Sequence, residues 1–253
     1  MKPPTAVHQH QHRRRQRGVS PVEILVGLVI SLLIVGGLGH LVTGTRETTR
    51  VERNLQQMQE SGRVAVQMIS RELRKSGFRT ERVLAVDVVF PAAAPFVTAG
   101  AVLSGGDDTV TQRYLGSGDT WMRNCVGGDV AAAAMVVQTV SVAGGELRCR
   151  AQNLGAGTDI TQPLLSNIEA MQLRYGIDVD GDSYADSYVA AAAVADWTQV
   201  ASIDVRLRTV STDDNLSHTP QPYIGFNGSV VTPTDRRLRR NYSTVIALRN
   251  RLP

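Results

Sequence analysis

The hydrophobic pattern divides the chain into an apolar run, an amphipathic segment and a long region of short apolar stretches. The apolar run reads ILVGLVISLLIVGGLGHLVT from Ile24 to Thr43 and contains no formal charge. As a helix this run is about 30 Å long, which matches the hydrocarbon core of a membrane. The pattern therefore predicts a transmembrane helix over about residues 24–43.

After Thr45, apolar residues recur at intervals that place them on one face of a helix. This stripe contains Gly62 in one slot and otherwise consists of Val51, Leu55, Met58, Ala65, Ile69 and Leu73. Arg and Glu occupy the other faces, so we predict an amphipathic helix whose stripe packs against a globular head. Gly77 is the candidate C-cap. The two segments together predict one N-terminal helix over residues 19–78.

Residues 79–253 are predicted to form a β-rich head. Apolar, β-branched stretches predict strands, and clusters of Gly and Asp between them predict turns. The candidate strands are Val83–Phe90, Thr109–Tyr114, Met135–Val142, Ile168–Ile177, Val200–Val210 and Tyr242–Leu248. The alanine-rich segment Val189–Ala195 predicts a short helix. The expected fold class is therefore α+β, with a long N-terminal helix packed on the head.

The formal net charge of +4 is concentrated at the N-terminus. Residues 1–18 contain five of the 27 basic residues and no acidic one, which leaves 22 basic against 23 acidic residues in the remainder. DNA binding requires clustered cations, and the one later cluster in the sequence lies at residues 236–240. We therefore expect no nucleic-acid partner. Basic residues ahead of the apolar run favour keeping that side in the cytoplasm, so the remainder would be exported.

Two cysteines, Cys125 and Cys149, in an exported chain suggest one disulfide. Closing a loop of this size would stabilise the fold by about 3–4 kcal/mol. The alternative is a pair of unlinked, buried thiols.

The residues before the apolar run do not follow the order of a secretory signal, whose shorter apolar region ends in a small-residue cleavage site. Here the basic stretch is followed at once by Gly18, then by VSPVE and the apolar run. Glu23 is thus a lone carboxylate at the edge of an apolar segment. An unpaired charge in a membrane costs at least about 2.5 kcal/mol, so we interpret Glu23 as functional rather than as an incidental part of a plain anchor.

Gly18, a five-residue stretch that ends in Glu23, and an apolar helix together resemble the class III signal of type IV pilins and pseudopilins. The resemblance implies that a prepilin peptidase cuts between Gly18 and Val19, removes residues 1–18 as a leader and methylates the new N-terminus. It also implies that Glu23, the fifth mature residue, pairs with the α-amine of a neighbouring subunit. Two residues depart from the family pattern: Val19 replaces the usual Phe, and Pro21 replaces a common Leu or Ile.

Further segments resemble the PilW group of minor pilins. The helix contains QESGRVA at residues 59–65 and SRELRKSGF at residues 70–78, similar to the group's Gly-Arg-x-Ala turn and its Arg-x-Leu-Arg-x-x-Gly-aromatic ending. The C-terminal stretches are MQLRYGID at residues 171–178, DRRLRR at residues 235–240 and STVIALRNR at residues 243–251. Residues 79–165 carry no such signal.

The resemblance implies a minor pilin that takes part in type IV pilus assembly, in a priming or tip complex. Its implied partners are other minor pilins, the major pilin, prepilin peptidase and a tip adhesin. The chain would lie in the inner membrane with its head in the periplasm before assembly, and in the fibre at the cell surface afterwards. The open alternatives are a minor pseudopilin of a type II secretion system, a membrane-tethered enzyme, and a DNA-uptake pilus component marked by residues 236–240.

The acidic loop from Asp178 to Asp186 is the strongest candidate for a metal site. Asp178, Asp180, Asp182 and Asp186 stand at positions 1, 3, 5 and 9, and the Tyr184 carbonyl would supply a ligand at position 7. Ca²⁺ takes six to eight oxygen ligands, and alternate residues of a tight turn can point inward together. The pattern departs from an EF-hand, because its glycine is at position 4 and no Glu stands at position 12. The loop therefore predicts a Ca²⁺ site, with a metal-free turn as the alternative.

Catalytic motifs are lacking in the sequence, which contains no GxSxG, HExxH or Walker A pattern. Three of the five histidines lie in the leader, His40 lies near the end of the predicted span, and His218 lies in a loop rich in Ser, Thr and Pro. We therefore expect a structural protein rather than an enzyme.

Overall fold

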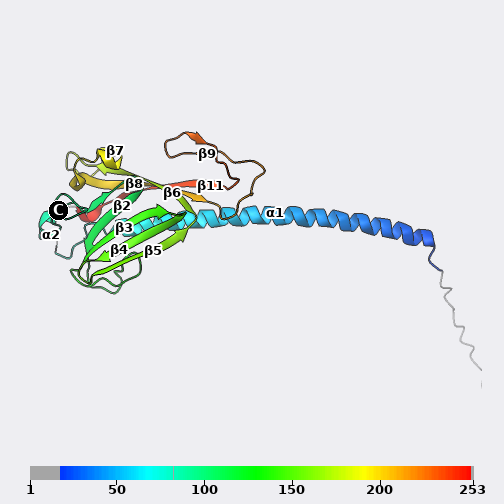
Figure 1. Cartoon of the computed structure of the whole chain (residues 1–253), viewed down its shortest axis with the longest axis horizontal. Coiled ribbons are helices and arrows are strands. Elements are labelled where there is room, and N and C mark those ends of the chain that lie inside the picture. The colour runs from blue at the N-terminus through cyan, green and yellow to red at the C-terminus, as the bar shows by residue number, and fades with distance from the viewer. Residues whose placement is uncertain (1–17, 82, 252–253) are drawn as a thin grey trace, which may run out of the picture. The chain divides into compact units, whose positions relative to one another are not determined.

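The computed structural model describes residues 18–81 and 83–251 (Figure 1). The chain divides into two compact units, Met1–Thr49 and Arg50–Pro253. Helix α1, Pro21–Leu73, begins in the first unit and ends in the second, which contains all the other elements. The predicted α+β class is confirmed, since one long helix precedes antiparallel sheets. The predicted leader, except for Gly18, lies outside the described residues, as does the side chain of His40.

A five-stranded antiparallel sheet forms the first part of the head. Its order is β1-β2-β3-β4-β5, so every strand pairs with its neighbour in the sequence. The strands are β1 Leu103–Gly105, β2 Thr109–Leu115, β3 Met135–Ala143, β4 Glu146–Asn153 and β5 Thr158–Ser166. A short helix, α2, precedes them at Val86–Val89.

A four-stranded antiparallel sheet of order β11-β8-β6-β7 forms the second part. Its strands are β6 Ile168–Ile177, β7 Ser187–Val189, β8 Val200–Val210 and β11 Arg239–Ala247. Between β8 and β11 the chain makes an excursion with a small hairpin, β9 Tyr223–Ile224 and β10 Val230–Val231. Single turns of 3-10 helix lie at Ala191–Ala193, Trp197–Gln199 and Arg249–Arg251.

The last turns of α1 are part of the hydrophobic core of the head. Ala65, Ile69 and Leu73 are fully buried in one cluster with residues of both large sheets, among them Val140 of β3 and Ile203 of β8. Full burial of an Ile or Leu side chain contributes about 1.5–3 kcal/mol, so this end of the helix is fixed to the head by packing. The predicted docking of the apolar stripe is thereby confirmed for this part of α1.

Two positions show how the stripe differs from simple helical periodicity. Leu55 is 39% exposed, whereas its neighbour Asn54 is only 6% exposed. Asn54 is buried because its amide bonds Asp213 twice, donating to Oδ2 at 3.2 Å and accepting from the backbone N–H at 3.1 Å. At Gly62 a β-carbon would lie 2.2 Å from the ring of Tyr242 on β11, so only glycine allows this close approach.

Some predicted elements of the head are wrong. The segment Val83–Phe90, predicted as a strand, contains the helical turn α2, and only Phe90 among its side chains is fully buried. Its apolar residues do not alternate with polar ones, so a strand here would have no single apolar face to pack on the core. The segment Val189–Ala195 forms one 3-10 turn after β7 rather than an α-helix. Strands β4 and β5 were not predicted, because charged side chains occupy the outer face of β4 and β5 is largely exposed.

Candidate assembly segment and cation loop

The start of α1 follows the predicted cleavage position closely. Gly18 and Val19 precede the helix, and the carbonyl of Ser20 accepts hydrogen bonds from Glu23 N at 3.0 Å and Ile24 N at 3.2 Å. Pro21 is the first helical residue, where its missing N–H has no intrahelical partner to lose. Glu23 lies in the first turn, where the helix dipole favours a carboxylate.

The large apolar side chains of α1 from Ile24 to Leu38 are exposed. Within the described residues, the exposed fractions of the large ones from Ile24 to Leu38 range from 52% to 77%. The hydroxyl of Ser31 bonds the Gly27 carbonyl at 2.7 Å, so this polar group is satisfied inside the helix. Among the described helices, α1 is the one that is long and apolar enough to cross a membrane. The predicted membrane anchor thus fits this helix.

Glu23 has no ion-pair partner among the described residues, and the next charged residue along α1 is Arg46. A carboxylate four residues from Val19 and next to an exposed apolar surface is costly in a membrane unless a cation approaches it. The pairing predicted for Glu23 stays a prediction.

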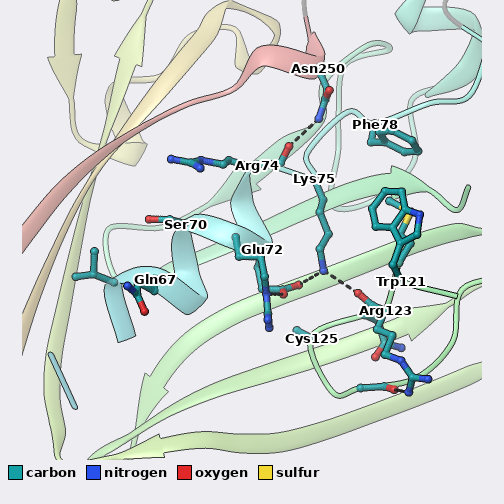
Figure 2. Close-up of a pocket in the computed structure, with 15 residues that line it drawn as sticks. Gln67, Ser70, Glu72, Arg74, Lys75, Phe78, Trp121, Arg123, Cys125 and Asn250 are labelled. Carbon is teal, nitrogen blue, oxygen red and sulfur yellow. Dashed lines mark hydrogen bonds and ion pairs between the residues drawn. The ribbon is translucent and has the colours of Figure 1, made fainter. Parts of the chain in front are cut away.

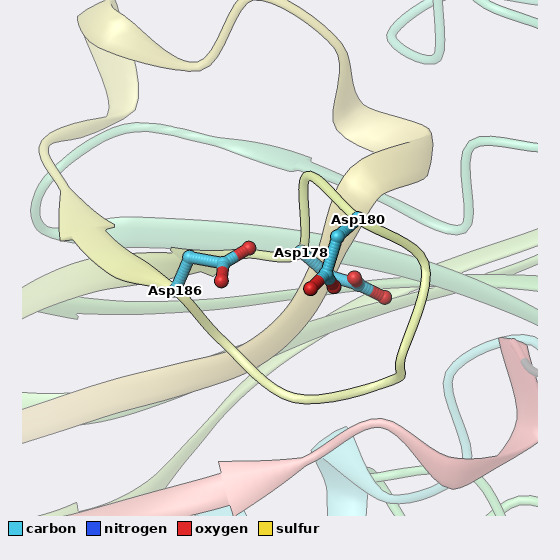
Figure 3. A group of neighbouring side chains, drawn as sticks. All are labelled: Asp178, Asp180 and Asp186. Atoms are coloured by element: carbon cyan, nitrogen blue, oxygen red, sulfur yellow. The ribbon is translucent and has the colours of Figure 1, made fainter.

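The acidic loop between β6 and β7 brings three of its four carboxylates together (Figure 3). Oxygen atoms of Asp178, Asp180 and Asp186 lie within 4.8 Å of one another. Asp178 is buried and accepts hydrogen bonds from Gly181 N at 2.7 Å and Ser183 N at 3.1 Å. These bonds wrap the loop around the carboxylates, a geometry that can bind a hard cation.

The fourth predicted carboxylate, that of Asp182, lies outside this group. Asp182 Oδ1 accepts a hydrogen bond from Tyr184 N at 2.8 Å and is not among the grouped carboxylates. The ligand predicted at Tyr184 is its backbone carbonyl, and it stays a prediction. The structure therefore narrows the carboxylate part of the predicted site to Asp178, Asp180 and Asp186.

The predicted disulfide is present. Cys125, in the loop between β2 and β3, is bonded to Cys149 in the middle of β4, and their Cα atoms are 6.3 Å apart. Both residues belong to the main hydrophobic core. The bond therefore ties a long loop to the five-stranded sheet.

The basic cluster at residues 236–240 is partly neutralised within the head. Arg239 is nearly buried and forms ion pairs with Glu169 at 2.8 Å and with Asp235 at 2.7 Å. The hydrogen bond from Arg239 lowers the pKa of Asp235 to about 2. The guanidinium of Arg240 lies 5.8 Å from the centre of the Tyr242 ring. The cluster thus includes an internal clamp between β11 and the loop before it.

A buried cation on β2 was not predicted. Arg113 is 3% exposed and donates hydrogen bonds to the carbonyls of Ala101 at 2.8 Å, Pro91 at 2.6 Å and Phe90 at 3.0 Å. Its guanidinium also lies 4.3 Å from the centre of the Phe96 ring. Burial lowers the pKa of Arg113 to about 10. No sequence pattern distinguishes this arginine from a solvated one, because its partners are backbone groups.

A cleft of about 810 Å³ was also not predicted (Figure 2). It lies between the last turns of α1 and the loop that carries Cys125. The last turn of α1 contributes Arg71, the turn after it contributes Arg74, and the loop contributes Trp121 and Arg123. The arginines near the end of α1 are separated from the loop residues in the sequence by the whole of β1 and β2, so only the fold brings the two groups together.

Comparison with known proteins finds a matching family model and similar solved structures. Residues 135–250 match the model of the PilW family, type IV pilus-assembly protein W. This match confirms the resemblance seen in the sequence, and the stretches at residues 171–178 and 235–240 lie within it. No curated protein matches the chain. A type IV-like pilin from Thermus thermophilus superposes with a TM-score of 0.46 at 16% identity, over 77% of this chain and 97% of that one.

Proposed function

We propose that this protein is a minor pilin, a structural subunit rather than an enzyme, that takes part in assembling a type IV pilus. The observation that carries the proposal is a single acidic residue in the first turn of an exposed apolar helix, in a chain whose head matches a pilus-assembly family. A soluble protein would not leave this surface uncovered, whereas a subunit packed in a membrane and then in a fibre would cover it.

The proposed mechanism is packing between subunits. Before assembly, α1 anchors the chain in the inner membrane, with the head in the periplasm. After cleavage, Glu23 meets the α-amine of a neighbouring pilin, and the apolar helices bundle around this pair. Two unit charges 4 Å apart attract by about 4 kcal/mol at an effective dielectric constant of 20, which is enough to set the stagger between helices.

The place of this subunit is proposed to be a priming or tip complex with other minor pilins, next to the major pilin and a tip adhesin. The alternative with the same helix chemistry is a minor pseudopilin of a type II secretion system. Deletion of the gene in its host distinguishes them. Loss of surface fibres with normal protein secretion supports the pilus role, and loss of secretion with normal fibres contradicts it.

Processing after Gly18 is the first prediction of this proposal. We expect the mature protein to begin at Val19 and to retain the apolar part of α1. The reason is that Gly18 lies just outside the helix, where it is accessible to a peptidase. Intact-mass analysis of the protein expressed in its host measures this directly. Gly18→Arg should leave the full-length mass. Gly27→Ala is the matched control, since a β-carbon at Gly27 meets no atom within 4 Å, and it should be processed normally. A mature N-terminus beyond residue 40 would contradict the prediction.

We further propose that the loop of Asp178, Asp180 and Asp186 binds one Ca²⁺. The three grouped carboxylates repel one another, and a divalent cation between them would remove this repulsion. Extracellular calcium sites have a Kd of about 10⁻⁴–10⁻³ M, so a site with few protein ligands can be filled outside the cytoplasm.

The calcium proposal predicts a shift in thermal stability. At ten times Kd, binding raises the free energy of unfolding by about 1.4 kcal/mol, or roughly 3–6 °C in the Tm of a head of this size. The full chain in detergent should melt higher in millimolar calcium than in chelator. Asp180→Asn should remove the shift, whereas Asp182→Asn, outside the carboxylate group, should retain most of it. Equal Tm values for the wild-type chain in calcium and in chelator would leave the loop as a metal-free turn.

A further inference from the structure

We propose that the cleft between the end of α1 and the Cys125 loop is a docking site for an acidic segment of another protein, with an apolar or aromatic side chain as its anchor. The surface that carries this inference is defined by Arg71, Arg74, Lys75, Phe78, Trp121 and Arg123, and we name it the basic cleft. All six residues lie in the second unit, so the inference does not depend on the position of the apolar helix.

The charge of the basic cleft favours an anionic partner. Four basic residues line it, against one acidic residue, Glu72. The Glu72 side chain is only 2% exposed and is already paired with Lys75 Nζ at 2.7 Å. Arg71, 69% exposed at its side chain, also contacts Glu72 at 3.2 Å, and Arg123 is paired with Asp129 at 3.2 Å. Arg74 is exposed and forms no ion pair with a described residue, so it is the cation most open to a partner. The four cations exceed the two carboxylates that pair with them, Glu72 and Asp129, so the net charge at the cleft is positive and favours carboxylates with the planar geometry that arginine recognises.

The exposed indole of Trp121 indicates a protein partner rather than a free anion. Trp121 is 72% exposed, beside a half-buried Phe78 and a buried Met122. Tryptophan and arginine are the residues most often found at the energetic centre of protein interfaces. A single large ring next to guanidinium groups fits a segment that carries both an apolar side chain and carboxylates. A volume of about 810 Å³ admits a few such side chains.

The walls of the basic cleft are held in place without a ligand. Lys75 Nζ, in the turn directly after α1, donates to the carbonyl of Arg123 at 2.7 Å, which joins this turn to the opposite loop (Figure 2). Asn250 donates to the carbonyl of Arg74 at 2.7 Å from the C-terminal end of the head. The disulfide between Cys125 and Cys149 ties this loop to β4. A preformed site of this kind loses little conformational entropy when a partner binds.

The test uses the full chain in detergent and a set of blocked nine-residue peptides, each with four acidic residues and a central Phe, Leu, Tyr or Trp. We expect at least one peptide to bind with a Kd on the order of 10⁻⁵–10⁻⁴ M by isothermal calorimetry, and more weakly at high salt. Trp121→Ala and Arg74→Glu should each weaken binding at least tenfold. Arg53→Glu is the matched control, because Arg53 is an exposed cation of α1 that does not line the cleft, and it should change the affinity less than twofold.

Three results would overturn the inference. One is the absence of binding by every acidic peptide at millimolar concentration. Another is equal binding by peptides with Lys in place of the acids. The third is concentration-dependent self-association of the full chain that Trp121→Ala removes, because the occupant would then be a second copy of this chain. The exposed side chains of Trp121 and Arg74 are not part of the core, so both variants should fold. Thermal unfolding of each variant checks this.

Discussion

Arg113→Met should destabilise the head by about 3 kcal/mol, a far larger effect than the loss of any exposed arginine. The substitution leaves the carbonyls of Ala101, Pro91 and Phe90 without the donor that now serves all three. Hydrogen bonds from a charged donor contribute about 1.5–3 kcal/mol each, and this sum is partly offset because a charge no longer has to be buried. The net loss corresponds to a Tm lower by roughly 6–12 °C for a domain of this size.

The reason for the large effect is that Arg113 organises a segment with little regular structure of its own. The three acceptors lie in the chain between α2 and β1, and the guanidinium stacks near the rings of Phe90 and Phe96. One side chain therefore replaces the backbone pairing that a strand would provide. Lysine lacks the planar fork with which the guanidinium of Arg113 reaches three divergent carbonyls. Arg113→Lys should therefore recover only part of the stability that Arg113→Met loses.

Arg150→Met is the matched control for this prediction. Arg150 lies on β4 and pairs with Asp159 on β5, but its side chain is half exposed. Exposed ion pairs contribute about 0–1 kcal/mol, so this variant should melt within about 4 °C of the wild-type chain. Thermal unfolding of the full chain in detergent, followed by near-ultraviolet circular dichroism, measures all three variants. If Arg113→Met melts together with Arg150→Met, the carbonyl cluster does not need the guanidinium.

The parts of the fold that the sequence predicts are those in which apolar residues recur at a regular helical or strand spacing. The stripe of α1 and the apolar strands β3, β6 and β8 were predicted from such repeats, and the structure confirms them. Strand β4 was missed although Leu147, Cys149 and Ala151 alternate inward, because Arg148 and Arg150 between them suggest a solvated loop. Strand β5 was missed because it is an edge, so its sequence carries no buried face.

The candidate sites divide in the same way. Glu23 and the acidic loop were found because their residues are close together in the sequence and unusual for their surroundings. The basic cleft was not found, because its geometry joins residues about 50 positions apart through the packing of the end of α1 against the Cys125 loop. Arg113 was not found, because its partners are backbone carbonyls 12 to 23 positions away. A cation that binds carbonyls, and a tryptophan that is exposed, look in one sequence like any other arginine and tryptophan.

Glu23→Ala should yield a subunit that is processed and inserted in the membrane, yet absent from fibres. In the proposed assembly the carboxylate neutralises the α-amine of a neighbouring pilin within an apolar helix bundle. Removal of one partner from a buried ion pair costs about 3–5 kcal/mol, because the other charge stays in an apolar environment. Since 1.4 kcal/mol is a tenfold change, incorporation should fall by at least about a hundredfold. Fibres sheared from the host and probed for this subunit measure the loss.

The variants at this position separate charge from shape. Glu23→Gln keeps the size of the side chain and should fail like Glu23→Ala, whereas Glu23→Asp keeps the charge on a shorter side chain and should assemble in part. Glu47→Ala is the control, because Glu47 is also an exposed acid of α1 but lies beyond the apolar run, and it should assemble normally. The head has its own core, so none of these changes should alter its unfolding. Recovery of the Glu23→Ala subunit in fibres at the wild-type ratio would mean that the carboxylate has no partner in the bundle, and that the apolar surface of α1 alone drives its packing.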